Sequence, residues 1–194
     1  MIWLKNIEKI SSNLGSLSVS DSHSDNIEVD KGFALWADLT AQIREQRKTV
    51  FLIGNGASAS MASHVAADLA KNAHVHTEVF TDLSLITAIA NDLSFEDVFS
   101  EPLKRRSKNG DMLVAISSSG KSVNIIRAAQ TAKMLGGKVI TISAMSADNP
   151  LRRNGDYNFY VPANTYGIAE TCHAAILHHW IDKIISENKD TVED

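Results

Sequence analysis

The chain repeats one local pattern, in which a short apolar run leads through a turn of small residues into a helix-like segment. The run "TVFLIG" at residues 49–54 precedes an Ala-rich segment at residues 58–73. The run "DMLVAIS" at residues 111–117 precedes "SSGKS" and then "VNIIRAAQTAKMLGG". Apolar runs without polar alternation, separated by helices, are typical of parallel strands that are buried on both faces. The pattern predicts the α/β class, with a doubly wound parallel sheet and helices on both faces.

Other segments complete the predicted sheet and its helical surroundings. The runs "HTEVF", "KVITISA" and "YNFYVP" are interpreted as further strands and bring the expected number to about five. Residues 166–187 are expected to form a long C-terminal helix. Before the first strand, apolar residues at helical spacing predict two helices, which the polar connection "SLSVSDSHSDNIEVD" joins as a loop.

Length and composition limit the domain organisation and the classes of partner. With 194 residues, 44% of them hydrophobic, the chain suits one substantial core. We expect an N-terminal helix and polar loop over residues 1–32, a single domain over 33–188 and a C-terminal tail over 189–194. The formal net charge of -4 comes without a basic stripe, which argues against polymeric nucleic acid as a ligand.

The cysteine count and the hydropathy pattern indicate a compartment. Cys172 is the only cysteine, which excludes an intrachain disulfide and a paired-cysteine metal site. The N-terminal "MIWLKNIEKISSNLG" has charged residues among its apolar ones, and no apolar run reaches membrane length. We expect a cytoplasmic protein with no membrane partner.

Two loops carry the features of an anion site. In doubly wound sheets, ligands bind beyond the carboxyl ends of the strands, where loops enter helices whose first amides favour anions. "GNGAS" at residues 54–58 offers two glycines and the Ser58 hydroxyl, and "ISSSGKS" at residues 116–122 offers four serines. Neither loop has the spacing of a P-loop or of a dinucleotide motif. A phosphate monoester on a small molecule is the functional interpretation, and a merely well-capped helix is the alternative.

A histidine and a carboxylate share one face of the helix after the first strand. His64 and Asp68 are four residues apart in "HVAADLAKN", and side chains at that spacing project together. The pair suits two ligands of one metal, or an acid beside its partner. A solvated helix face is the alternative.

The predicted last helix carries one glutamate and three histidines near its start. Glu170 and His178 lie about 80° apart around an ideal helix, so they share a broad face. His173 and His179 compete with His178 for any functional role. The residues alone leave open which histidine is functional.

The order of these motifs is more specific than any one of them. "GNGAS", "HVAAD", "ANDLSFEDVF", "ISSSGKS" and "ETCHAAILHH" follow one another as in the SIS (sugar isomerase) domain family. Within that family the chain most resembles the sedoheptulose-7-phosphate (phosphoheptose) isomerases, over residues 33–187. The resemblance implies an aldose-ketose isomerase that acts on a sugar phosphate through an enediol. It also implies a homotetramer whose active sites are shared between subunits.

The resemblance implies roles for individual residues. Asp68 and His178 match the family's catalytic acid-base pair. Members that carry zinc bind it at positions that match His64, Asp68, Glu170 and His178. The substrate-binding positions of the family match a longer set: Asn55, Ser58, Asp92, Ser117, Ser118, Ser119, Ser122 and Glu170.

The chain departs from the family pattern at four positions. Asp68 replaces a glutamate and is one methylene shorter. Glu170 replaces a glutamine and adds a negative charge that favours a cation. By the same resemblance, Asn72 stands where the heptose isomerases carry an arginine, and Gly167 stands where they carry an acidic residue.

Two other functions are compatible with the same fold. A non-catalytic SIS protein, similar to the replication-initiator-associating protein, binds a partner and lacks the catalytic acid, so the presence of Asp68 and His178 favours the enzyme. A sugar-phosphate-sensing transcription regulator needs a helix-turn-helix domain, for which residues 1–32 are too short. A phosphosugar isomerase is the leading hypothesis.

Overall fold

The computed structural model describes residues 2–190, without the side chains of residues 188–190. Seven strands form one sheet in the order β2-β1-β7-β6-β5-β3-β4. Five of them are parallel and coincide with the five predicted strands: β3 (Thr49–Ile53), β4 (His76–Val79), β5 (Met112–Ser117), β6 (Lys138–Ser143) and β7 (Tyr157–Tyr160). The doubly wound α/β class is therefore confirmed.

The expected polar loop at residues 16–30 is wrong in part, because it contains the two strands that raise the count from five to seven. β1 (Ser18–Asp21) pairs antiparallel with β7, with Val19 opposite Phe159. β2 (Asn26–Ile27) pairs antiparallel with β1 at the edge of the sheet. Val19 is only 1% exposed, and it is the single large apolar side chain of β1, which is too weak a pattern to predict a strand.

Five helices lie where the sequence predicts them: α1 (Trp3–Gly15), α2 (Val29–Glu45), α3 (Ala57–Asn72), α6 (Val123–Met134) and α7 (Tyr166–Asp190). Four further helical segments were not expected: α4 (Leu83–Asp92), the 3₁₀ turn η1 (Phe95–Asp97), α5 (Ser100–Arg106) and the 3₁₀ turn η2 (Pro150–Arg153). Because α7 continues to Asp190, the predicted tail begins inside a helix, and residues 191–194 lie outside the described part. Within residues 2–190, no helix is long and apolar enough to cross a membrane.

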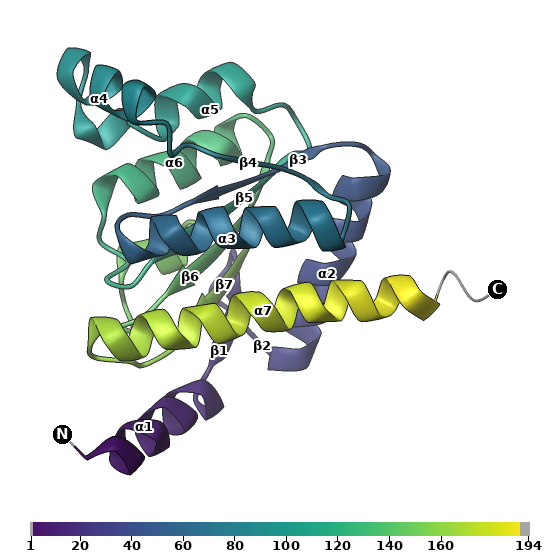
Figure 1. The fold of residues 1–194 in the computed structure, drawn as a ribbon, viewed down its shortest axis with the longest axis vertical. Helices are drawn as coiled ribbons and strands as arrows, with labels where there is room; N and C mark the ends of the chain where they lie inside the picture. The colour runs from purple at the N-terminus through teal and green to yellow at the C-terminus, as the bar shows by residue number, and fades with distance from the viewer. Residues whose placement is uncertain (1, 191–194) are drawn as a thin grey trace.

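The sheet has a hydrophobic core on each face, because successive strand side chains point to opposite sides. On one face α2, α3 and α7 cover strand residues such as Leu52 and Val114, and Trp36 of α2 stacks on Trp180 of α7 with ring centroids 4.0 Å apart. On the other face α5 and α6 cover Phe51 and Leu113. Figure 1 shows these helices on the two sides of the sheet.

The strand order predicts a ligand site between β3 and β5. The chain runs from β3 outward to β4 at one edge and then returns to β5 on the other side of β3. Ligands of doubly wound sheets bind at such a reversal, outside the carboxyl ends of the strands. Those ends of β3 and β5 lead directly into α3 and α6. α3 also lies beside α7, and both helices begin at the same end of the molecule (Figure 1).

Candidate active site

A pocket of about 160 Å³ lies at the predicted place, where β3 and β5 end. Seven of its nine lining residues are predicted substrate-binding residues: Asn55, Ser58, Ser117, Ser118, Ser119, Ser122 and Glu170. Ile116 and Tyr166 complete the lining. The volume is small beside the several hundred cubic ångströms of a typical cofactor or drug site. The pocket therefore suits one compact polar group.

Close backbone approach explains the glycines in the two loops of the pocket. A Cβ at Gly54 would lie 2.5 Å from the carbonyl carbon of Ser58, so the turn from β3 into α3 has no room for a side chain. A Cβ at Gly120 would lie 1.9 Å from the side-chain oxygen of Asn149, and Gly120 has a φ of +60°. At both positions a side chain would collide with the packing of the loop itself, and only glycine avoids the collision.

The serine loop offers hydrogen-bond donors to that space. The Ser117 hydroxyl donates to the Ser122 hydroxyl at 3.3 Å, and the backbone N–H of Lys121 donates to the Ser119 hydroxyl oxygen at 3.2 Å. Ser122 is the N-cap residue of α6, and its side chain makes no capping hydrogen bond. This weakens the alternative that the serines only cap a helix. The starts of α3, α6 and α7 all meet the pocket, and their dipoles favour an anion there.

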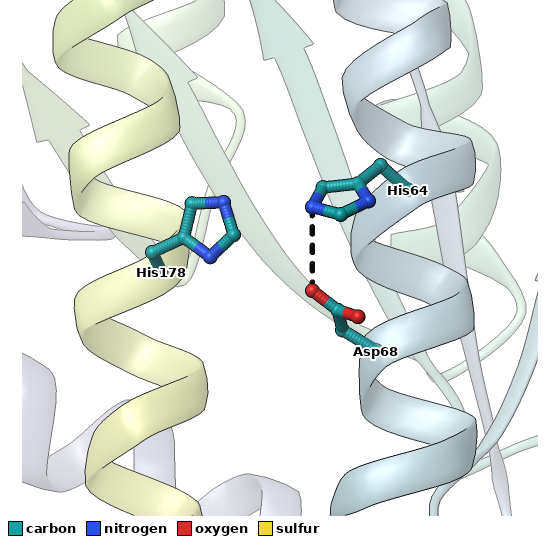
Figure 2. Close-up of side chains that lie close together, drawn as sticks. All are labelled: His64, Asp68 and His178. Carbon is teal, nitrogen blue, oxygen red and sulfur yellow. Dashed lines mark ion pairs between the residues drawn. The ribbon is translucent and has the colours of Figure 1, made fainter.

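A second group of side chains lies further along α3 and α7. His64 and Asp68 come from α3, with His64 Nε2 3.3 Å from an Asp68 carboxylate oxygen. His178 comes from α7 and faces them (Figure 2). Ligand atoms from the three residues all lie within 4.8 Å of one another. The His64 and Asp68 side chains are 58% and 28% exposed, so the group is open to a ligand.

The three residues have the chemistry of a zinc site. Two imidazoles and one carboxylate, with an open position for substrate, form a ligand set that catalytic zinc uses in proteins. Glu170, the fourth predicted ligand, is not part of this group within the described residues and lines the pocket instead. The structure thus brings together three of the four predicted metal ligands, and the role of Glu170 as a ligand stays a prediction.

The structure separates the three histidines of α7. His173 is fully buried, and neither of its ring nitrogens has a hydrogen-bond partner among the described residues. Burial lowers the pKa of His173 to about 4, and the Ser143 backbone acts in the opposite direction with a smaller effect. The His179 ring packs edge-on against Phe33 at 4.5 Å, in a different surface groove. His178 alone of the three faces α3.

Asp92 lies apart from both the pocket and the three-residue group. It is exposed at the end of α4, where its carboxylate accepts a hydrogen bond from the Asn91 side chain at 2.9 Å. Its predicted contact with substrate stays a prediction.

Two residues near the pocket were missed by the sequence interpretation. Tyr166 lines the pocket one helical turn before Glu170, at the start of α7. Asn124, in the first turn of α6, is hydrogen-bonded to Asn55 of the pocket lining. The sequence signal that could have identified Asn124 is its position two residues after Ser122, a predicted anion-binding serine.

Comparisons with known proteins agree with the family that the order of the motifs indicates and with the fold. The family model described as SIS domain matches residues 21–144, more than half of the chain. A phosphoheptose isomerase from Chlorobaculum parvum is 34% identical over 79% of this chain and 77% of its own length. A phosphoheptose isomerase from Shewanella denitrificans is 31% identical over 86% of this chain and 93% of its own.

Solved structures give the same result at the level of the fold. The phosphoheptose isomerase from Neisseria gonorrhoeae superposes with a TM-score of 0.79 at 26% identity, covering 95% of each chain. That of Francisella tularensis superposes with the same TM-score at 22% identity, covering 96% of this chain. The chain therefore belongs to the SIS domain family and, within it, to the phosphoheptose isomerases.

Proposed function

We propose that this protein interconverts sedoheptulose 7-phosphate and an aldoheptose 7-phosphate through an enediol. The observation that carries the proposal is the arrangement of two sites along two neighbouring helices. The anion pocket lies at the starts of α3 and α7, and the group of His64, Asp68 and His178 lies further along the same helices. Such a pair of sites suits a substrate with a phosphate at one end and the reacting carbons at the other.

The separation of the two sites supports a long sugar chain. His64 follows Ser58 of the pocket lining by six residues, which corresponds to about 9 Å along a helix. With carbon–carbon bonds of about 1.5 Å, an extended heptose phosphate spans roughly 9 to 10 Å from phosphorus to its first carbons, and a triose phosphate roughly 5 Å. The pocket would hold the phosphate while the carbonyl end reaches the group.

The proposed proton transfers use Asp68 and His178. Isomerisation removes a proton from the carbon beside the carbonyl and returns one to the former carbonyl carbon, while a second proton moves between the oxygens. Asp68 is assigned the transfer at carbon, and His178 the transfer at the oxygens. Serine hydroxyls and backbone amides of the pocket would anchor the phosphate and hold the reacting carbons in place.

We further propose that His64, Asp68 and His178 bind Zn²⁺, with Glu170 as a fourth ligand. The two imidazoles and the carboxylate have the donor atoms that this metal binds, and these atoms lie within 4.8 Å of one another, so that side-chain rotation would bring them to one ion. Bound zinc would polarise the substrate carbonyl and stabilise the negative charge of the enediolate.

A homotetramer with shared active sites is also proposed. Two parts of the surface support it, because large apolar side chains are exposed there. Trp3 and Leu4 of α1 are 71% and 70% exposed. Leu83 at the start of α4 and Phe95 at the start of η1 are 73% and 57% exposed. Asp92 lies between the latter two in the sequence, so a copy that covers this surface would bring Asp92 to a neighbouring subunit.

A reducing, cytoplasmic location is proposed on the basis of the single cysteine. Cys172 is buried, and burial raises the pKa of its thiol. It is therefore unsuited to forming a disulfide with another chain.

The reaction is tested with purified protein and a panel of ketose phosphates of three to seven carbons, with and without zinc. We expect turnover of sedoheptulose 7-phosphate, and losses of at least about 100-fold in kcat for Asp68→Asn and His178→Gln. Asp182→Asn and His179→Gln are matched controls on α7 and should retain activity. Binding of sedoheptulose 7-phosphate without turnover of any sugar phosphate would contradict the proposal and favour a non-catalytic binding protein.

A further inference from the structure

The side-chain amides of Asn55 and Asn124 form a reciprocal pair across the two loops of the pocket. The Asn55 Nδ2 group donates to Asn124 Oδ1 at 3.0 Å, and the Asn124 Nδ2 group donates to Asn55 Oδ1 at 2.9 Å. Asn55 belongs to the turn between β3 and α3, whereas Asn124 belongs to the first turn of α6. The pair thus connects the glycine turn to the helix that follows the serine loop.

A backbone group determines how the two amides are oriented. The N–H of Ile125, which can act only as a donor, points at Asn124 Oδ1 at 3.0 Å. That contact places the oxygen of Asn124, and not its NH₂ group, at this position. Asn55 must then donate to the same oxygen and accept from the Asn124 NH₂ group. The orientation of the Asn55 amide is therefore set by the backbone of α6 through Asn124.

Among the described residues, the pairing leaves one hydrogen-bonding face of Asn55 free. A primary amide has two N–H donors and an oxygen with two acceptor positions. The pair uses one donor and one acceptor position of Asn55. Asn55 lines the pocket, whereas Asn124 is absent from its lining and only 3% exposed. The second N–H of Asn55 therefore remains for a ligand, and Asn124 itself has no route to one.

We propose that Asn124 is a positioning residue, which holds the Asn55 amide so that its free N–H meets the phosphate end of the substrate. The proposal rests on the proposed function for the identity of the substrate, but its core claim concerns anion binding by the pocket. Without Asn124 the Asn55 side chain would rotate freely and present its oxygen to the anion part of the time. An anion would then bind more weakly, because a carbonyl oxygen repels it.

The test uses Asn124→Leu, which has the same number of side-chain heavy atoms, a larger volume and no hydrogen-bonding group. Inorganic phosphate is the probe, with calorimetry as the binding measurement, and KM and kcat are measured with sedoheptulose 7-phosphate. We expect phosphate affinity to fall and KM to rise by about tenfold each, with kcat changed by less than about threefold. Thr131→Val, a buried change further along α6, is the matched control and should leave both constants as in the unaltered protein.

A double-mutant cycle separates positioning from a general effect on the fold. If Asn124 acts through Asn55, then Asn124→Leu should have no further effect on phosphate affinity in an Asn55→Ala background. The side-chain NH₂ signals of Asn55 in NMR spectra provide a direct readout. Their hydrogen exchange should be slow in the unaltered protein and fast in Asn124→Leu.

Two outcomes would overturn the inference. One is unchanged phosphate affinity in folded Asn124→Leu, and the other is an additive effect of the two substitutions in the cycle. If Asn124→Leu does not fold, Asn124→Ala replaces it, because Ala removes the same donor and acceptor and adds neither bulk nor charge. Weakened phosphate binding in protein that turns over no sugar phosphate would support the positioning role while the isomerase proposal fails.

Discussion

The rings of His64 and His178 lie with their centroids 5.3 Å apart, although the two residues belong to the third and the last helix. Both helices begin at the pocket that Ser58 and Tyr166 help to line, and they run side by side (Figure 1). The two imidazoles are therefore held by the packing of α3 against α7, and Asp68 joins them because it lies one turn after His64.

Zinc should stabilise the protein through this group. A metal that binds only the folded state at about 100 times its Kd adds roughly 2.7 kcal/mol, which corresponds to about 5 to 10 °C in Tm for a chain of this size. His64→Ala should abolish most of that increase, whereas His179→Ala should retain it. Thermal unfolding with and without zinc, together with the metal content of the purified protein, measures the effect. Equal increases in the two variants would argue against the site.

The charge of Glu170 should weaken the binding of free phosphate. Glu170 is the one carboxylate in the lining of the pocket, so its repulsion opposes an anion there. Glu170→Gln should strengthen phosphate binding severalfold, and Asp182→Asn, with the same change in net charge on α7, should not. Calorimetry measures both. If Glu170 is also a zinc ligand, the same variant will bind zinc more weakly, and if it is not, zinc affinity will stay the same.

Replacement of Gly120 should distort the serine loop. Gly120→Ala would place a Cβ 1.9 Å from the Asn149 side-chain oxygen at a φ of +60°. Asn149 cannot easily move, because its NH₂ group donates to Ser146 and Ser143. A loss of about 1–3 kcal/mol in unfolding free energy is expected from such strain, together with weaker phosphate binding. Gly15→Ala, with nothing within 4 Å of its Cβ, is the control for urea denaturation.

The free energy of unfolding should decrease as the pH is lowered below about 6.5, because His173 is buried in its neutral form. Its folded-state pKa of about 4 lies below the ordinary value of 6.5, so the unfolded chain binds more protons between these values and acid favours unfolding. Its contribution is fully present above pH 6.5 and decreases as the pH falls toward 4. Between pH 7 and pH 5 the loss amounts to about 2 kcal/mol.

The variant His173→Leu isolates this contribution from that of other groups. Its unfolding free energy should depend less steeply on pH than that of the unaltered protein, with the curves separating between pH 6.5 and pH 4. Urea denaturation at several pH values measures the difference. Parallel curves for the two proteins would show that His173 is not buried in its neutral form.

Tyr166 should contribute to substrate binding, because it stands at the pocket one turn before Glu170. Tyr166→Ala should raise the KM for a sugar phosphate by roughly three- to tenfold with a smaller effect on kcat, as expected for a residue that only binds. Tyr166→Phe separates the hydroxyl from the ring. A KM unchanged in both variants would remove Tyr166 from the site.

Some strands and site residues could be predicted from local sequence patterns, and others could not. The strands with several consecutive buried residues, such as "MLVAIS" of β5, are recognisable because their burial on both faces leaves no polar alternation. β1 was missed because its only large apolar residue, Val19, is buried by antiparallel pairing with β7. That partner lies far away in the sequence, so no local pattern reports it. Local sequence likewise does not distinguish the functional candidate His178 from His173 and His179, because the three histidines differ only in what surrounds them.

The sequence by itself determined the α/β class, the two loops that line the pocket and the family, since each depends on local periodicity or on the order of short motifs. Only the tertiary structure decided which residues meet. It placed Asn124 against Asn55, left Glu170 in the pocket and outside the group of His64, Asp68 and His178, and buried His173. The physical reason is that hydrogen bonds, metal ligation and desolvation act over a few ångströms. Helix packing, which brings distant residues within that range, depends on the whole core.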